Sequence, residues 1–128
     1  MRQPHFYVLL NHPLLEKQIQ DIEALGKEIV YLPHELRALW KQVDVPVRAH
    51  IEPILAYLSE HLHPEDIVLV QGHAGATYIV VNHVHALGAT AVYAHSPKDP
   101  TQRDQILSAK DTLSLKHFEH IGFVAYGV

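Results

Sequence analysis

The sequence contains no cysteine, which excludes disulfides, thiolate metal sites and cysteine nucleophiles. It also lacks any apolar run near the roughly 20 residues that a helix needs to span a bilayer. The apolar start at Phe6–Leu10 is too short for a signal peptide and runs into polar sequence. These absences predict a protein of a reducing cytoplasm that has no membrane partner.

Positive charge is also scarce, because 10 Lys and Arg against 14 Asp and Glu give a net charge of 10 − 14 = −4. A broad DNA-binding surface needs the opposite balance, so DNA is not an expected partner. A compact anionic ligand remains possible, because a few aimed N–H groups and one or two cations can outweigh a mildly acidic remainder. The length of 128 residues, 48% of them apolar, predicts one domain over residues 1–128.

Apolar runs alternate with stretches of helical periodicity. The runs at 6–10, 67–70 and 90–94 predict buried strands, of which 67–70 is expected to be buried on both faces, and 28–32 predicts a further strand. The spacing at 13–25, 33–40, 47–61 and 75–87 predicts helices. Pro13 is expected in the first turn of the first helix. Residues 97–110 predict a loop with a short helix, and 113–126 one or two strands in an antiparallel hairpin at the sheet edge. The fold is therefore expected to be α/β and Rossmann-like, with a mostly parallel sheet and helices on both faces.

Polar residues follow three of the predicted strands: Asn11-His12, Gln71-Gly72-His73 and His95-Ser96. In open α/β sheets, ligands bind beyond the carboxyl ends of the strands, where the strand order reverses. The middle segment continues as Gly-x-x-Gly-x-Thr, which is neither the dinucleotide fingerprint nor a phosphate loop with its Lys. A strand, a glycine turn and a helix present free N–H groups to an anion, although such turns also close βα units that bind nothing. The convergence of three polar strand ends predicts an anion site.

Four segments together resemble a known family. They are the strand followed by Asn11-His12, the stretch Tyr-Leu-Pro-x-Glu-Leu-x-x-x-Trp at 31–40, the stretch Leu-Val-Gln-Gly-x-x-Gly-Ala-Thr at 69–77, and Val-Tyr-Ala at 92–94. The chain resembles the small stand-alone ring nucleases of type III CRISPR systems, which have a Rossmann-like fold of the CARF type. The resemblance covers nearly the whole chain, and His117-Phe-x-His120 is similar to the closing segment of that family.

The resemblance implies a symmetric homodimer without a cofactor that takes part in antiviral defence. It would bind a cyclic oligoadenylate, above all the ring of four, and cut it to linear products that end signalling. Two positions depart from the family pattern. His73 stands where an Asp is expected, and His95-Ser96-Pro97-Lys98 stands where two Thr and a basic residue are expected.

Each ribose of such a ring carries a 2′-hydroxyl beside a phosphate, so the ring supplies its own nucleophile. Attack by that hydroxyl leaves a 2′,3′-cyclic phosphate and a 5′-hydroxyl and requires no metal. The protein must align the atoms, move two protons and offset the charge of the phosphorane. We expect His12, His73 and Thr77 to be catalytic, because the histidines titrate in the useful range and the hydroxyl can donate to phosphate. The expected ligand-binding residues are Asn11, Gln71, Gly72, Ala74, Gly75, Ala76, His95, Ser96 and Lys98, with Arg103 as a second possible cation.

Other readings of the same residues stay open. Thr77 is also expected to cap the helix, Gln71 can tie two loops together, and His95 and Ser96 can serve the turn at Pro97. His83 and His85 fall on different faces of their helix, so they do not form a metal pair. Three alternative functions are a protein that sequesters the cyclic nucleotide without cutting it, a histidine-based metallohydrolase, and an α/β interaction module.

Overall fold

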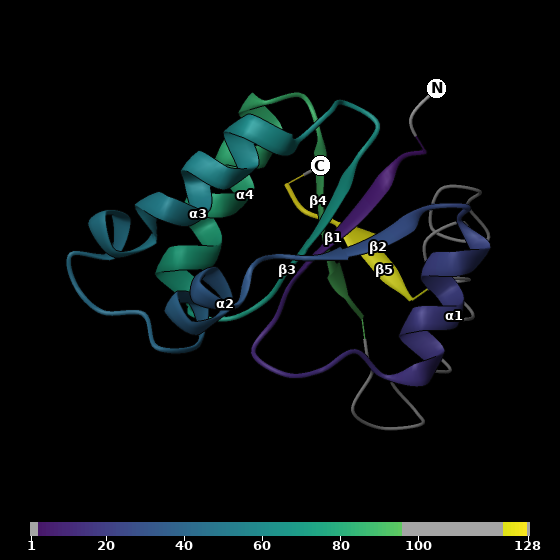
Figure 1. Ribbon diagram of the computed structural model, residues 1–128, viewed down its shortest axis with the longest axis horizontal. Coiled ribbons are helices and arrows are strands. Elements are labelled where there is room, and N and C mark those ends of the chain that lie inside the picture. The colour runs from purple at the N-terminus through teal and green to yellow at the C-terminus, as the bar shows by residue number, and fades with distance from the viewer. Residues whose placement is uncertain (1–2, 96–121, 128) are drawn as a thin grey trace.

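The computed structural model describes residues 3–95 and 122–127, which form one five-stranded sheet flanked by helices (Figure 1). The strand order is β2-β1-β3-β4-β5; the first four strands are parallel and β5 is antiparallel to β4. The elements are β1 (His5–Leu9), α1 (Glu16–Ala24), β2 (Glu28–Tyr31), α2 (His34–Lys41), α3 (Val47–His61), β3 (Ile67–Val70), α4 (Ala74–Ala86), β4 (Thr90–Ala94) and β5 (Phe123–Ala125). The predicted Rossmann-like α/β fold is confirmed. In this order the topological switch lies between β1 and β3.

Both faces of the sheet are covered, which explains the continuous apolar runs. In β1, Tyr7 and Leu9 belong to one hydrophobic cluster while Phe6 and Val8 belong to another. Helices α2, α3 and α4 cover the first face and α1 lies on the second (Figure 1). Because a strand sends successive side chains to opposite faces, a central strand buried on both must be apolar throughout.

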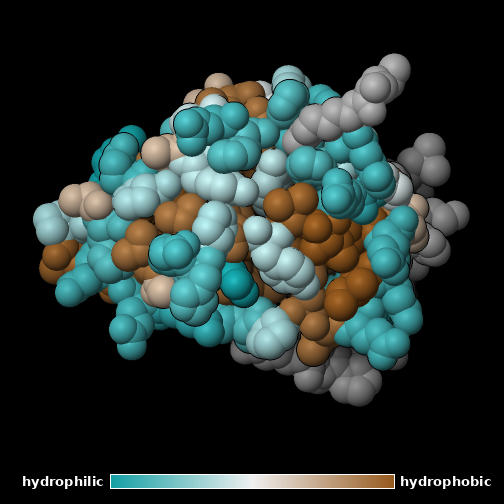
Figure 2. All heavy atoms as spheres, viewed as in Figure 1, coloured by the Kyte–Doolittle hydropathy of each residue, from teal (hydrophilic) through white to brown (hydrophobic). Residues whose placement is uncertain are grey.

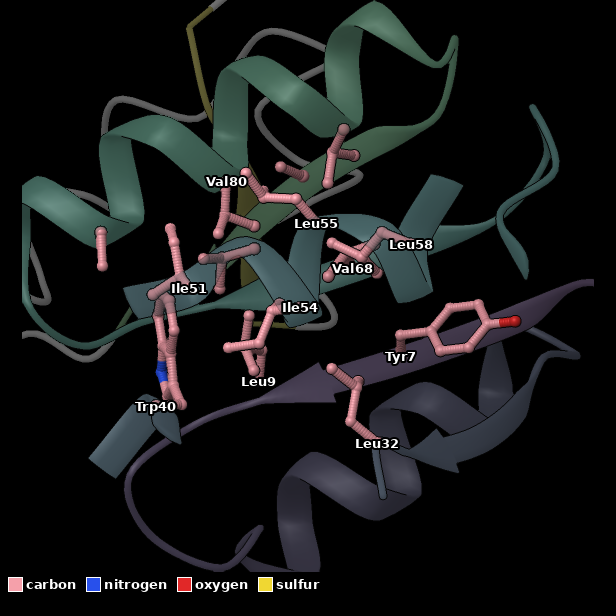
Figure 3. Close-up of a cluster of buried hydrophobic side chains, with 14 of the residues drawn as sticks. Tyr7, Leu9, Leu32, Trp40, Ile51, Ile54, Leu55, Leu58, Val68 and Val80 are labelled. Atoms are coloured by element: carbon pink, nitrogen blue, oxygen red, sulfur yellow. The ribbon is translucent and has the colours of Figure 1, made fainter. Parts of the chain in front are cut away.

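The larger cluster lies between the sheet and the helices α2, α3 and α4. Ile51, Ile54, Leu55 and Leu58 come from one side of α3 and are buried there, as the spacing over 47–61 predicts. Figure 3 shows Trp40 at one end of this cluster and Tyr7 at the other. None of the helices that the structure describes is both long and apolar enough to cross a membrane. On the face drawn in Figure 2, hydrophilic side chains cover most of the surface, and apolar surface gathers beside α1.

The first helix begins later than the sequence predicts. It starts at Glu16 rather than at Pro13, because Leu15 has an extended backbone and its N–H donates to the Gln18 side chain at 2.9 Å. Leu14 is buried in the smaller cluster from the preceding non-helical segment, so its apolar character continued the helical pattern without belonging to the helix. The antiparallel edge strand is confirmed for 123–125, whereas the predictions for 97–110 and 113–121 concern residues outside those described.

Asp66 anchors the end of the sheet at which the parallel strands begin, opposite to their carboxyl ends. Its side chain is fully buried, and its two oxygens accept hydrogen bonds from the backbone N–H groups of His5 and His63, each at 2.9 Å. The carboxylate therefore joins the start of β1 to the loop that leads into β3. A buried carboxylate that receives N–H donors satisfies both itself and the backbone.

We expect Asp66→Ala to lower the free energy of unfolding by about 2–4 kcal/mol, because two buried N–H groups lose their acceptor. Urea denaturation measures this loss. Asp44→Ala is the matched control, since Asp44 is exposed and, among the described residues, its side chain accepts only the N–H of the next residue, Val45; it should change stability by less than about 0.5 kcal/mol. Equal losses in the two variants would contradict the anchoring role.

Candidate functional site

Gln71 fastens the ends of three elements together at the carboxyl edge of the sheet. Its N–H donates to the Leu9 carbonyl at 3.1 Å, and its own carbonyl accepts from the Trp40 indole N–H at 2.9 Å. Its side-chain oxygen accepts from the Ala94 N–H at 2.9 Å. The reading of Gln71 as a residue that ties loops together is therefore confirmed. Because a backbone N–H can only donate, the side-chain oxygen is the bonded atom and the amide NH₂ keeps its donors.

The glycine turn lies directly against Trp40. A Cβ added at Gly72 would be 2.7 Å from the indole Nε1, closer than real Cβ contacts. Trp40 is buried and cannot move aside, so this position requires glycine because of close approach. The segments at 31–40 and 69–77, which are far apart in sequence, thus meet at one contact.

Helix α4 begins two residues after Gly72, and His73 is its N-cap. The Nδ1 atom of His73 accepts from the Ala76 N–H at 3.2 Å, and the Thr77 N–H donates to the His73 carbonyl at 2.8 Å. The N–H groups of Ala74 and Gly75 lie in the first turn, where a helix offers them no acceptor. These free donors and the positive end of the helix dipole form an anion-binding geometry.

Thr77 is not the N-cap, because the helix already begins at Ala74 and His73 caps it. The Thr77 hydroxyl oxygen is buried and has no hydrogen-bond partner among the described residues, and the side chain would have to rotate to present its donor to a ligand. Since Nδ1 of His73 accepts a hydrogen bond, the neutral ring carries its proton on Nε2 and can donate a hydrogen bond from that atom.

A cavity of about 600 Å³ opens beside this turn, a size typical of small-molecule sites. Its described lining contains no carboxylate and no Lys or Arg, so the polarity comes from N–H groups, amides and hydroxyls. The lining residues are Gln71, Gly72, Ala74 and Thr77 from the turn, Tyr78, Val81, Asn82 and His85 from the rest of α4, and Tyr126 and Gly127 from the segment after β5.

Tyr126 forms the wall opposite α4. Its hydroxyl donates to the Val70 carbonyl at 2.7 Å, and its N–H donates to the Ala91 carbonyl at 2.9 Å. Burial, with a smaller contribution from Tyr93, raises the pKa of Tyr126 above its usual value. The phenol therefore stays protonated at neutral pH and does not serve as a base there.

Side chains along α4 that were not predicted from the sequence extend the cavity. Tyr78, Val81 and His85 recur at helical spacing from Ala74, which is the signal that could have found them. Tyr78 is 73% exposed at the rim, the kind of aromatic surface on which a base can stack. His83 points the other way, with Nε2 at 2.8 Å from the Ser59 hydroxyl and 3.0 Å from the Leu55 carbonyl. The predicted separation of His83 and His85 is confirmed.

His12 lies on the same edge of the sheet but in a different hollow. This second depression, of about 260 Å³, is lined by Val8, Leu10, His12, Pro13, Tyr31, Arg37 and Lys41. The Nδ1 atom of His12 is 3.0 Å from the Pro13 carbonyl. Because a carbonyl can only accept, Nδ1 carries the proton and Nε2 keeps a free lone pair.

Besides His12, five of the predicted residues that the structure describes do not line the large cavity: Asn11, His73, Gly75, Ala76 and His95. Asn11 is exposed at the end of β1, and Ala76 is buried in the core. His95 donates its N–H to the Gly122 carbonyl at 2.8 Å, and within the described part of the chain its buried Nε2 has no partner. Ser96, Lys98 and Arg103 are outside the described residues. The structure thus gathers Gln71, Gly72, Ala74 and Thr77 around one cavity and places His12 in another.

We expect Gly72→Ala to lower the free energy of unfolding by about 1–3 kcal/mol, because its Cβ overlaps the indole of Trp40. Trp40 is the only tryptophan of the chain, so its fluorescence during urea unfolding reports both stability and a displaced ring. Gly75→Ala is the matched control: its Cβ would meet only the exposed His73 ring at 3.2 Å, and alanine favours a helix by up to about 1 kcal/mol. A Gly72→Ala protein with native stability and an unchanged spectrum would refute the close contact.

Comparison with known proteins extends over almost the whole chain. The uncharacterized protein MJ1673 family matches residues 4–124. Uncharacterized protein MJ1673 of Methanocaldococcus jannaschii is 33% identical over 128 residues, which is 96% of this chain and 97% of that relative. No solved structure matches the chain. The matched segment contains the glycine turn, all of α4 and the residues that line the smaller depression beside His12.

Proposed function

The chain belongs to the uncharacterized protein MJ1673 family, and we propose that it is a metal-independent ring nuclease for cyclic oligoadenylate, chiefly the ring of four. The observation that carries the proposal is the glycine turn that opens, with the first turn of α4, into a cavity of about 600 Å³ free of carboxylates along its described lining. The resemblance of the segments at 31–40 and 69–77 to ring nucleases supports it further, because these segments meet at Gly72.

Phosphate binding would fall to neutral donors. The N–H groups of Ala74 and Gly75 lie in the first turn of α4, next to the cavity that Ala74 lines, and the NH₂ of Gln71 adds two donors. Thr77 also lines the cavity, and its buried hydroxyl would have to rotate toward the ligand to donate. The exposed ring of Tyr78 offers a surface for stacking an adenine. A ring of four nucleotides is larger than one such cavity, and a two-fold homodimer presents two equivalent cavities to it. The proposal sets this reaction in the cytoplasm, as part of type III CRISPR defence.

Proton transfer would fall to His12, which takes a proton, and to His73, which gives one. Nε2 of His12 has a free lone pair and takes the proton of the 2′-hydroxyl, which attacks the adjacent phosphorus. The bond from phosphorus to the 5′-oxygen breaks, and that oxygen takes its proton from Nε2 of a His73 imidazolium. This leaves the ring neutral with its remaining proton on Nδ1, the atom that otherwise accepts from the Ala76 N–H. The products are a 2′,3′-cyclic phosphate and a 5′-hydroxyl. A ring lying across the carboxyl edge of the sheet would reach both hollows.

One observation favours a second function, which is binding without cleavage. His73 holds the helix cap through Nδ1, and protonation of that atom breaks the hydrogen bond to Ala76. An imidazole that is held as a structural acceptor is less free to exchange protons than one that is used for catalysis alone. A protein with this site could retain the ring intact and lower its free concentration.

We expect the purified protein to convert cyclic tetra-adenylate to products that end in a 2′,3′-cyclic phosphate, at a rate that excess EDTA does not change. His12→Ala and His73→Asn should each slow cleavage by about 10²–10⁴-fold, the usual contribution of a positioned acid or base. Asn is chosen at position 73 because it caps helices well but does not titrate. HPLC of single-turnover reactions measures these rates.

His63→Ala serves as the control, since this exposed side chain lies at the opposite edge of the sheet. It should leave the rate within about twofold, as for a surface change away from the site. Recovery of the intact ring from the denatured complex would favour the binding function. Loss of activity with EDTA, restored by a divalent cation, would favour a metallohydrolase. Failure of the ring to shift thermal stability would refute both binding and cleavage.

A further inference from the structure

We propose that the basic depression, the hollow lined by His12, Tyr31, Arg37 and Lys41, is a second anion site that takes a phosphate group. It lies at the carboxyl ends of β1 and β2, away from the glycine-turn cavity. That it holds a phosphate of the same ligand rests on the proposed function; that it binds phosphate at all does not.

The depression is built from separate parts of the chain. Val8 and Leu10 come from the end of β1. Tyr31 ends β2 and is 48% exposed, so its hydroxyl is accessible. Arg37 and Lys41 are one turn apart on α2, and both are exposed. Side chains at this spacing lie on the same side of a helix, so the two cations face one space.

The charge in the depression is unbalanced. Its described lining contains no carboxylate, and within residues 3–95 and 122–127 no carboxylate pairs with Arg37 or Lys41. Two cations one turn apart repel each other, and an anion between them removes the repulsion. This local excess is notable in a chain whose net charge is −4.

The chemistry of these side chains suits phosphate. A guanidinium donates two parallel hydrogen bonds to phosphate oxygens, and a lysine adds a compact positive charge. The volume of about 260 Å³ is below the range of sites that hold drug-sized ligands. We infer that the depression takes the phosphate or phosphodiester group itself rather than a whole nucleotide.

Two hydrogen bonds join Gln71, which lines the large cavity, to residues that adjoin the basic depression, and we infer that one ligand can reach both hollows. Trp40, which lies between Arg37 and Lys41 in the sequence, donates to the Gln71 carbonyl beside the large cavity. The Leu9 carbonyl accepts a hydrogen bond from the Gln71 N–H, and the next residue, Leu10, lines the basic depression. In a ligand with several phosphates, the phosphate that is cleaved would lie between His73 and His12, and a neighbouring one would lie between Arg37 and Lys41.

The test compares Arg37→Gln/Lys41→Gln with Arg48→Gln/Lys17→Gln, a control that removes the same charge from exposed positions on α3 and α1. Titration calorimetry with cyclic tetra-adenylate at low and high salt should show at least a tenfold loss of affinity and a weaker salt dependence in the first protein. The control should stay within twofold. NMR of the Arg37 side-chain N–H during titration with sodium phosphate should show a saturable shift in the wild type and in the control.

The two probes separate the possible outcomes. Loss of ring affinity together with the phosphate shift supports a shared ligand, whereas the phosphate shift with unchanged ring affinity supports a site for free phosphate alone. If the wild type does not bind the ring, the proposed function fails and the phosphate titration alone decides the inference. No saturable shift of Arg37, with equal ring binding by both variants, overturns the anion site.

Discussion

The contact between Trp40 and the glycine turn holds the carboxyl edge of this sheet in place. The indole N–H fixes the Gln71 carbonyl at 2.9 Å, and the ring lies where any side chain at position 72 would have to go. Gln71 passes this constraint to β1 and β4 through its N–H and its side-chain oxygen. The position of the first turn of α4, and therefore of its free N–H groups, depends on α2 packing against the sheet.

Much of the fold could be predicted from the sequence, because its central strands are buried on both faces and its helices carry regular apolar stripes. The start of α1 could not, because Leu14 is buried from an extended segment and imitates the first turn of a helix. Periodicity records burial without recording the backbone conformation that produces it. The antiparallel edge strand could be predicted because the apolar residues near the end of the chain stand beside a glycine.

The candidate site could be predicted only in part. Gln71 and Gly72 after β3 line the large cavity, as their position beyond a parallel strand implies, whereas His73 is not among its lining residues. The wall formed by Tyr126 was not predictable, since it depends on the pairing of β5 with β4, a contact between distant segments. His12 shares the edge with the glycine turn, but it faces the hollow beside α2. The sequence predicts that a residue lies at the carboxyl end of the sheet, but it does not predict which hollow at that end the side chain faces.

The fit between the indole and the glycine has an evolutionary consequence. Neither position 40 nor position 72 can change freely while the other keeps its present side chain, because the volume between them is already filled. A relative that carries a smaller aromatic or aliphatic residue on this helix would have room for a methyl group in the turn. The two positions should therefore vary together among homologous chains, although the two hydrogen-bonded residues are 31 positions apart in the sequence.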